Sequence, residues 1–326
     1  MAFLVFLALL SALPVPCLLS DSLTFLAVGD WGGKPTAPYT TEAETKTASS
    51  MGITAEKLES SFQLSLGDNF YSYGVKNVED ERFNETFENV FTASSLQSPW
   101  LISLGNHDHY GNESAQIAYT NVSKRWYLPN NYYTKTYPID ESGHTLQLVV
   151  IDTILLAGLT DPILRYLPPP GPLSVDQADK QWTWIEKTLT ESNATWLLVA
   201  GHYPVWSICK HGPTDILVSR LKPMLEKYNA SAYLCGHDHC MEHIHDGSNP
   251  VNYYLIGAGH LTDSSEHHMK DIPKGSLVYH YGPSDPEDDH GSYASVSVTS
   301  EQMKIVFYDS SDQHVLYENV QSNPRN

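Results

Sequence analysis

Side chains that bind metal ions stand directly after short apolar runs at five places in the chain. The five segments are Gly29-Asp30-Trp31, Gly67-Asp68-Asn69-Phe70-Tyr71, Gly105-Asn106-His107-Asp108, Gly201-His202-Tyr203-Pro204 and Gly236-His237-Asp238-His239. Because a glycine after a strand permits a sharp turn, we expect the side chains that follow it to reach the carboxyl edge of a sheet. The pattern predicts one metal site built from Asp30, Asp68, Tyr71, Asn106, His202, His237 and His239.

Seven oxygen and nitrogen ligands suit two metal ions that share one carboxylate, and Asp68 is the candidate bridging ligand. Asp30, Tyr71 and His239 would complete the first position. A phenol has an ordinary pKa of about 10, so only a strong Lewis acid ionises it readily. The first position therefore favours Fe³⁺.

The second position takes Asn106, His202 and His237, which are mostly neutral ligands. Such ligands suit Fe²⁺, with Zn²⁺ or Mn²⁺ as alternatives. Two cations about 3.5–4 Å apart can hold a phosphate ester and stabilise its in-line transition state. A trivalent ion would also supply a metal-bound hydroxide as nucleophile in an acidic compartment.

Two histidines outside the ligand set are candidate catalytic residues. His107 is adjacent to a predicted ligand, and we expect Asp108 to orient its ring. His211 lies on the loop after His202 and is the second candidate for protonating a leaving alkoxide. The remaining histidines are expected to be solvated or structural, with His260, which follows a strand, as the candidate exception.

The elements that position these residues alternate between strands and helices at first, and later become a run of strands. Strands are predicted at Leu23–Val28, Phe62–Leu66, Leu101–Leu104, Tyr132–Tyr137, Thr145–Ile151, Trp196–Ala200, Ala232–Cys235, Tyr253–Ile256, Tyr293–Val298, Met303–Tyr308 and His314–Glu318. Helices are predicted at Thr40–Ser60, near Glu79–Phe91, and from Ser174 to about Thr190. This order predicts an α/β fold with two mixed β-sheets packed face to face and flanked by helices.

The proline-rich stretch Leu155–Leu173 interrupts this pattern. It contains Pro162 and the segment Pro168-Pro169-Pro170-Gly171-Pro172, so we expect no regular element there. Long irregular loops in compact domains are often functional. Because this loop follows the strand that ends near Asp152, we expect it to lie over the site.

The amino terminus and the sequons indicate the secretory route. Residues 1–20 contain no charged side chain and have an apolar centre, which is typical of a signal peptide, and residues 21–326 can form a single domain. Five Asn-x-Ser/Thr sequons predict a glycoprotein that is secreted or lysosomal: Asn84, Asn112, Asn121, Asn193 and Asn229. The net charge of −19 excludes a broad basic surface for duplex nucleic acid and argues against docking on an anionic membrane.

Three cysteines remain after the predicted signal peptide. Cys209 and Cys240 each lie within two residues of a predicted site histidine, so their loops should meet, and a disulfide between them is a hypothesis, with the pairing of the three cysteines left open. Cys235 lies in an apolar strand and is expected to be a buried free thiol.

In the order of these motifs the chain resembles the purple acid phosphatases of the calcineurin-like metallophosphoesterase superfamily, in particular their tartrate-resistant, type 5 branch. The likeness extends over the whole mature chain and includes the segments Ala200–Ile208 and Tyr233–His239. It implies a double β-sandwich that hydrolyses phosphate monoesters at acidic pH. It also implies ferric ligands Asp30, Asp68, Tyr71 and His239, second-iron ligands Asp68, Asn106, His202 and His237, and substrate-binding, proton-donating His107 and His211.

The resemblance further implies an inhibitory loop whose cleavage activates the enzyme. Leu155–Leu173 occupies that place, with Asp161 as an anionic competitor at the metals. Nicking this loop is therefore predicted to raise turnover.

Three functions fit these residues. The first is an acid phosphatase, a monomer acting on small molecules, nucleotides or phosphoproteins. The second is a secreted iron-binding or redox protein that uses the same di-iron site without turnover. The third is a relative that depends on Zn²⁺ or Mn²⁺. Intact His107 and His211 favour an enzyme, because an iron carrier needs no proton donors.

Overall fold

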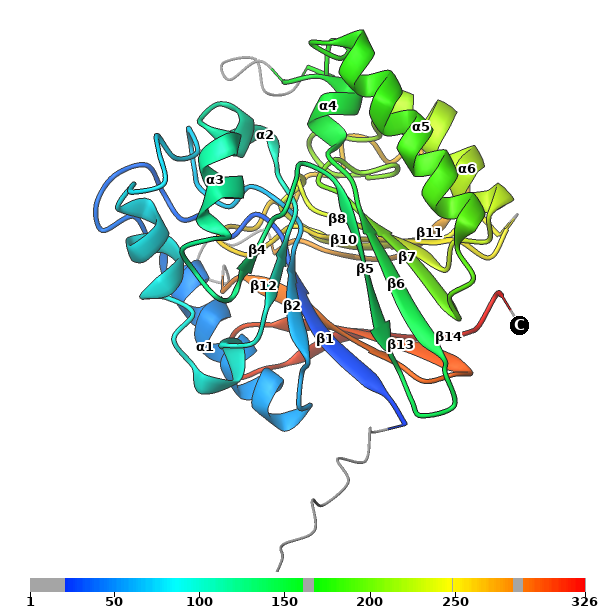
Figure 1. Ribbon diagram of the computed structural model, residues 1–326, viewed down its shortest axis with the longest axis horizontal. Coiled ribbons are helices and arrows are strands. Elements are labelled where there is room, and N and C mark those ends of the chain that lie inside the picture. The colour runs from blue at the N-terminus through cyan, green and yellow to red at the C-terminus, as the bar shows by residue number, and fades with distance from the viewer. Residues whose placement is uncertain (1–20, 161–166, 248, 284–289, 326) are drawn as a thin grey trace, which may run out of the picture.

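In the computed structural model, which describes residues 21–160, 167–247, 249–283 and 290–325, two seven-stranded sheets pack face to face with helices outside them (Figure 1). Both sheets contain parallel and antiparallel pairs. The predicted α/β fold with two mixed sheets is therefore confirmed. The predicted signal peptide, residues 1–20, lies outside the described residues.

The first sheet has the strand order β14-β13-β12-β1-β2-β3-β4. Its parallel part runs from β1 to β4, with Phe25 opposite Phe62 and Leu64 opposite Leu101. β12 pairs with β1 in the antiparallel direction. The strands are β1 (Leu23–Val28), β2 (Phe62–Ser65), β3 (Trp100–Ile102), β4 (Trp126–Tyr127), β12 (Ser292–Val298), β13 (Gln302–Asp309) and β14 (Val315–Ser322).

The second sheet has the order β11-β9-β10-β8-β7-β6-β5. Its parallel part is β6-β7-β8-β10, with Val149 opposite Val199. The strands are β5 (Tyr133–Pro138), β6 (Thr145–Val150), β7 (Trp196–Ala200), β8 (Ala232–Cys235), β9 (Met241–Ile244), β10 (Asn252–Ile256) and β11 (Leu277–Tyr281).

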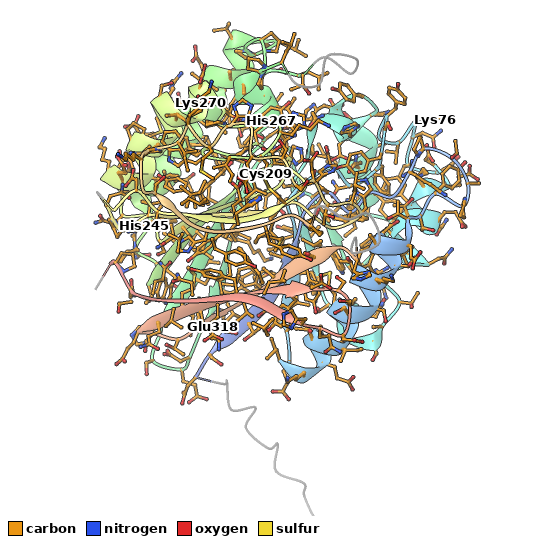
Figure 2. The ribbon with its side chains drawn as sticks, turned by 180° about the vertical axis from the view of Figure 1, so that it is seen from behind. Lys76, Cys209, His245, His267, Lys270 and Glu318 are labelled. Atoms are coloured by element: carbon orange, nitrogen blue, oxygen red, sulfur yellow. A yellow bond between two sulfur atoms is a disulfide. The ribbon has the colours of Figure 1, made fainter. Side chains whose placement is uncertain are left out.

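The central strands β7, β8 and β10 of the second sheet are buried on both faces. In β7, Trp196 and Leu198 belong to the core shared by the two sheets, whereas Leu197 and Val199 pack in a second core beneath the outer helices. A strand covered on both faces needs an uninterrupted apolar run, which is what the sequence of β7 provides. Side chains fill the space between the sheets and under the helices (Figure 2).

Local capping explains where the longer helices begin. The hydroxyl of Thr41 accepts from the N–H of Glu44, and the Glu44 carboxylate accepts from the N–H of Thr41, which forms a capping box for α1. Ser174 caps α5 by accepting from the N–H of Gln177. The α-helices are α1 (Glu42–Lys57), α2 (Asn106–His109), α3 (Glu113–Tyr119), α4 (Thr153–Ala157), α5 (Val175–Glu191) and α6 (Lys222–Lys227).

Shorter π and 3-10 turns lie at Phe83–Glu88, Ser94–Leu96 and Leu217–Leu221. None of the helices in the described residues combines the length and the apolar character needed to cross a bilayer.

Some element predictions were wrong. The helix expected near Glu79–Phe91 is a single π-helical segment, Phe83–Glu88. No regular element was expected in Leu155–Leu173, but its first residues belong to α4. That helix is stabilised by Asp152, whose side chain accepts from the N–H groups of Ile154 and Leu155. Strands β9 and β11 were not predicted. Their residues carry His and Glu among the apolar ones, which hides the strand pattern.

Candidate metal centre

The loops that carry the predicted ligands come from both sheets and meet where the sheets join. The N–H of Gly29, at the end of β1, donates to the carbonyl of Ile256, at the end of β10, at 2.8 Å. The loops after β1, β2 and β3 approach from the first sheet, and those after β7 and β8 from the second. The predicted ligands therefore lie at a junction of two sheets rather than at the edge of one.

The three side chains predicted for the first ion lie together. The Tyr71 hydroxyl donates to Asp30 Oδ1 at 2.8 Å and lies 3.1 Å from His239 Nε2. His239 Nε2 is 3.5 Å from the same Asp30 oxygen. Burial, together with the negative charges of Asp30 and Asp68, raises the pKa of Tyr71 well above its ordinary value. Only a strong Lewis acid would ionise this phenol, so the donor set fits a trivalent cation.

The second group gathers around His202. Its Nδ1–H donates to the carbonyl of Leu66 at 2.9 Å, which turns Nε2 toward Asn106 Oδ1 at 3.1 Å and Asp68 Oδ1 at 3.4 Å. A histidine held in this way by a carbonyl is oriented to bind a metal through its other nitrogen. Asp68, His202 and His237 place their ligand atoms within 4.8 Å of one another.

The charges around His202 favour a cation at this position. Burial alone would lower the pKa of His202, but the carboxylates of Asp68 and Asp30 raise it to about 9. The two carboxylates thus attract positive charge to the ring, which a metal ion can supply in place of the proton. The residues of the second group fit a divalent cation.

Asp68 lies between the two groups. Its Oδ1 accepts the backbone N–H of His107 at 2.9 Å and faces His202, while the carboxylate also interacts with the hydroxyl of Tyr71. Burial opposes its ionisation, yet His202 and His107 hold the pKa of Asp68 well below its ordinary value. An ionised carboxylate in this position can bind two cations at once, so Asp68 remains the candidate bridge.

The glycines of the five motifs act differently from our expectation. Within these five motifs, positive φ angles occur at the predicted ligands Asp30 (57°), Asp68 (53°) and His237 (75°), and of the five leading glycines only Gly67 has one. Such angles are strained for residues with a Cβ and concentrate at functional sites. A Cβ added to Gly236 would lie 2.4 Å from Asp30 Oδ2. The absence of a side chain therefore lets a carboxylate approach the backbone.

His107 borders the same cavity, but its partner is not the predicted one. Its Nδ1 donates to the carbonyl of Ser72 at 2.7 Å, and its Nε2 lies 3.9 Å from Asp68 Oδ2. The prediction that Asp108 orients this ring is wrong. Asp108 instead accepts from the backbone N–H of Gly105 at 2.8 Å and so fixes the turn.

His211 also lines the cavity, and it is held there by Asp238, a residue that had no predicted role. Asp238 accepts the N–H of His211 at 2.8 Å and the hydroxyl of Ser207 at 2.6 Å. The ring of His211 lies with its centroid 4.3 Å from that of His237. The position of Asp238 between two predicted ligands was the available signal.

His260 also belongs to the site, as its place after a strand suggested. Its Nδ1 donates to the carbonyl of Asp30 at 2.6 Å, and its ring stacks on Tyr71 with centroids 4.2 Å apart. It lines the cavity and supports the backbone of one predicted ligand.

A cavity of about 390 Å³ opens over these residues. Its floor includes Asp68, Tyr71 and His107, and Lys34 and Lys210 lie among its lining residues. The start of the proline-rich loop reaches it through Thr160. Asp161, the predicted anionic competitor, lies outside the described residues.

Comparison with known proteins defines the class. A family model described as calcineurin-like phosphoesterase matches residues 23–241. The chain is 44% identical over 309 residues to tartrate-resistant acid phosphatase type 5 of Homo sapiens, covering 94% of each chain. It is 44% identical over 293 residues to the type 5 protein of Oryctolagus cuniculus, covering 90% of this chain and 89% of that one. The chain belongs to the calcineurin-like phosphoesterases and, among them, to the tartrate-resistant type 5 acid phosphatases.

A solved structure shares the fold at lower identity. GAP50, described as the anchor in the inner membrane complex of Plasmodium, is 20% identical with a TM-score of 0.76, and the match covers 93% of this chain and 89% of that chain. Because a fold can serve unrelated functions, the activity must be argued from the side chains of the site.

Proposed function

We propose that this acid phosphatase hydrolyses phosphate monoesters at a binuclear Fe³⁺–M²⁺ centre held by Asp30, Asp68, Tyr71, Asn106, His202, His237 and His239. The observation that carries the proposal is the position of Asp68, an ionised carboxylate between a phenol-containing group and a histidine-containing group. When bound, the two cations would neutralise the phosphate and lower the pKa of a water molecule. Fe²⁺ is the expected second ion, with Zn²⁺ or Mn²⁺ as alternatives.

His107 and His211 would bind the ester and protonate the leaving oxygen from two sides of the cavity. The bond from Nδ1 of His107 to Ser72 leaves its Nε2 to face the Asp68 side, where the ester must sit. Burial lowers the pKa of His107, so the ring carries its second proton only in acid. This agrees with an acidic working pH, because a general acid must be protonated before it can donate.

Two lysines among the residues that line the cavity bear on the substrate class. These are Lys34 and Lys210, and Lys210 Nζ lies 3.9 Å from Asp263 Oδ2. Two cationic side chains beside a phosphate site favour esters that carry a second anionic group, as nucleotides and acidic phosphoproteins do.

The proposal is tested by hydrolysis of p-nitrophenyl phosphate near pH 5, within the range in which histidine charges, with wild type and His107→Ala compared. Metal analysis and a visible spectrum are measured on the same samples. We expect two metal ions per chain in both proteins, a tyrosinate-to-iron band, and activity that falls in the variant by about 10²–10⁴-fold. Full iron binding with no hydrolysis by the wild type would support the alternative, an iron-binding or redox protein. A colourless, active protein would support the Zn²⁺ or Mn²⁺ relative.

We also propose passage through the secretory route, with a lysosomal or secreted destination, a glycosylated chain and a monomeric state. Four of the five sequon asparagines are exposed: Asn84, Asn121, Asn193 and Asn229. Asn112 is half-buried and caps α3 through the N–H of Ala115, so it is the least suitable acceptor. Mass spectrometry before and after enzymatic deglycosylation, with size measured by light scattering, tests these statements.

A further inference from the structure

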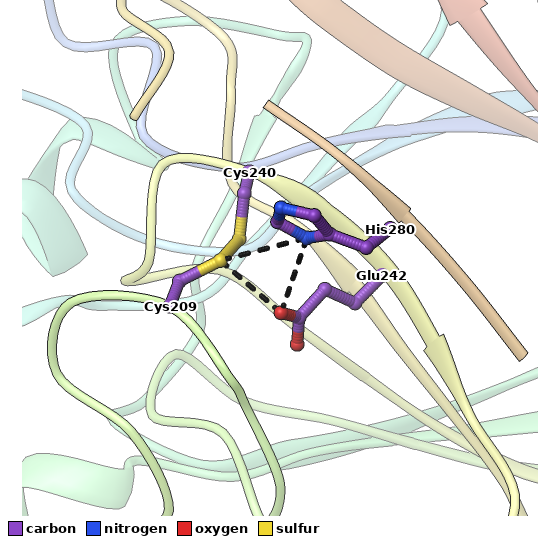
Figure 3. A group of neighbouring side chains, drawn as sticks. All are labelled: Cys209, Cys240, Glu242 and His280. Atoms are coloured by element: carbon purple, nitrogen blue, oxygen red, sulfur yellow. Dashed lines mark hydrogen bonds and ion pairs between the residues drawn. A yellow bond between two sulfur atoms is a disulfide. The ribbon is translucent and has the colours of Figure 1, made fainter. Parts of the chain in front are cut away.

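A second group of potential metal ligands, Cys209, Cys240, Glu242 and His280, lies beside the candidate metal centre. None of these four residues has a role in the proposed phosphatase reaction. The structure confirms the predicted disulfide between Cys209 and Cys240 and the buried free thiol of Cys235. Figure 3 shows that Glu242 and His280 point at this disulfide. One ligand atom from each of the four side chains lies within 4.8 Å of the others.

The two non-cysteine members are close to the sulfur and to each other. Glu242 Oε1 lies 3.1 Å from Cys209 Sγ and 3.5 Å from His280 Nδ1, and the same imidazole nitrogen lies 3.8 Å from Cys209 Sγ. Glu242 comes from β9 and His280 from the adjacent strand β11, where the two residues are paired in register. The sheet therefore holds the carboxylate and the imidazole in fixed positions.

Burial makes this arrangement costly unless a positive charge compensates it. Cys209, Cys240 and Glu242 are each fully buried. An ionised carboxylate in an apolar interior is unfavourable when it is not paired. A disulfide sulfur carries no proton to donate to Glu242, although it lies at hydrogen-bonding distance. Glu242 does accept the backbone N–H of Ile208 at 3.1 Å and lies 3.5 Å from the His280 imidazole. These partners hold the carboxylate in place, and a bound cation would add a positive charge beside it.

The backbone spacing suits chelation as well as a disulfide. The Cα atoms of Cys209 and Cys240 are 7.0 Å apart, at the wide end of what disulfides span. Two thiolates bound to one zinc ion at about 2.3 Å each need their sulfur atoms to separate further than in a disulfide. The observed spacing allows this without a large movement of either loop.

We propose that, when the Cys209–Cys240 disulfide is reduced, Cys209, Cys240, Glu242 and His280 form a binding site for one zinc-like divalent cation. Two thiolates, an imidazole and a carboxylate are a ligand set that selects Zn²⁺ over Mg²⁺ or Ca²⁺. The bound ion would keep joined the same two segments that the disulfide joins, namely the loop of His211 and the turn of His239.

The chemistry is a two-electron exchange followed by metal capture. Two molecules of a small thiol are oxidised to their own disulfide, and their two electrons and two protons convert the protein disulfide into the thiols of Cys209 and Cys240. The cation then binds both sulfurs and displaces the two thiol protons into water. In the reverse direction, the small-molecule disulfide accepts two electrons from the two thiolates and, with two protons from water, returns to two thiols, which reforms the Cys209–Cys240 disulfide and releases the ion.

The test uses the complete protein with its own metals in place. A phosphine reductant replaces the thiol, since it is oxidised to its oxide and does not supply competing thiolates. Co²⁺ is then added, because sulfur-to-cobalt charge transfer gives an absorption band that the candidate metal centre, which has no cysteine ligand, cannot produce. Reduced wild type should bind one Co²⁺ with this band, which Zn²⁺ should remove. Protein that has not been reduced should give no band.

Variants identify the ligands. Cys235→Ser should leave the band unchanged, because Cys235 is not among the four residues whose ligand atoms converge. Glu242→Gln should weaken Co²⁺ binding about 10–100-fold, and His280→Gln should do the same. Exchange of both Cys209 and Cys240 for serine should abolish the band. Should that double variant fail to fold, the two single-ligand variants still decide the question. No band in reduced wild type, or full affinity in both Glu242→Gln and His280→Gln, would overturn the proposal.

Discussion

The backbone N–H of His237 donates to Asp30 Oδ2 at 2.7 Å, although the two residues are 207 positions apart and follow strands of different sheets. Both have positive φ angles. The Asp30 carboxylate thus accepts a hydrogen bond from the Tyr71 hydroxyl through Oδ1 and one from the His237 backbone, which follows a strand of the second sheet, through Oδ2. The geometry of the candidate metal centre depends on how the two sheets meet.

Adding a methyl group at Gly236 should disturb this contact. In Gly236→Ala the new Cβ would lie 2.4 Å from Asp30 Oδ2, closer than any real contact, so the carboxylate must move. We expect loss of bound iron and a fall in kcat of about 100-fold, the usual scale for a 1 Å misplacement. Gly143→Ala is the control for backbone strain away from the site, because its φ of 93° disfavours a Cβ while no atom lies within 4 Å of the added Cβ. Equal iron content in the two variants would contradict the geometric argument.

Removing the hydroxyl of Tyr71 should abolish the proposed tyrosinate-to-iron absorption band. Tyr71→Phe keeps the ring that stacks on His260 but deletes the hydroxyl that faces Asp30 and His239. We expect the visible band to vanish and the affinity of the first position to fall by at least about tenfold. Metal analysis and absorption spectra measure both effects. Tyr73→Phe, at a side chain that is 65% exposed, should look like wild type. A coloured Tyr71→Phe protein would remove the phenolate from the proposed ligand set.

Asp238 is expected to be a positioning residue for His211. In Asp238→Asn the amide nitrogen cannot accept hydrogen bonds, so the N–H of His211 or the Ser207 hydroxyl loses its partner. We expect kcat to fall about 10–100-fold, with both metals retained, and the alkaline limb of the pH–rate profile to change. Ser207→Ala is the matched control, because it removes one bond to Asp238 but leaves His211 bound, and its effect should be much smaller. Loss of metal from Asp238→Asn would point instead to a structural role.

The lysines at the mouth of the cavity should set the preference for doubly anionic esters. In Lys34→Ala and Lys210→Ala, KM for a nucleoside diphosphate should rise several-fold, since each change removes about 1 kcal/mol of attraction at a partly exposed site. KM for p-nitrophenyl phosphate should change little. The difference between substrates should shrink at high salt, because screening weakens such interactions. An equal rise for both substrates would contradict the assignment.

His243 should make the fold less stable in acid. It is buried between Asn252 and Tyr317, and burial, reinforced by the nearby His245, lowers the pKa of His243 to about 4. In the unfolded chain the pKa is near 6.5, so between pH 6.5 and 4 the unfolded state binds the proton more tightly. The free energy of unfolding should therefore be largest above pH 6.5 and fall toward pH 4 by at most about 3 kcal/mol. Denaturation of His243→Gln should show a shallower pH dependence over this window, and an unchanged slope would exclude His243 as its source.

The sequence predicted the strands of the candidate metal centre better than the way they assemble. β7 and β8 agree residue for residue with the prediction, because continuous apolar runs ending at a glycine have one common interpretation. Which sheet each strand joins depends on pairing between distant residues, and the sequence gives no local sign of it. For this reason the ligands were expected at one edge, whereas Asp30 and His237 come from different sheets.

The hydrogen-bonding partners of the site residues were harder to predict than the residues themselves. Asp108 was expected beside the His107 ring, but it contacts the backbone of Gly105, and a backbone carbonyl holds the histidine instead. Every residue has a backbone carbonyl, so the sequence does not indicate which carbonyl will accept a hydrogen bond from a given side chain. By contrast, Cys209 and Cys240 were correctly paired, because each is adjacent in sequence to a residue whose place was already inferred.

The long separation between Asp30 and His237 has a consequence for biosynthesis. During translation the amino-terminal strands emerge from the ribosome well before β8 exists. Domains tend to fold as units, and contacts between distant residues form late. A nascent chain would therefore expose four of its seven candidate metal ligands, those that follow β1, β2 and β3, with no partner sheet to close around them. Metal loading should accordingly be a late, post-translational event, dependent on metal supply after release of the finished polypeptide.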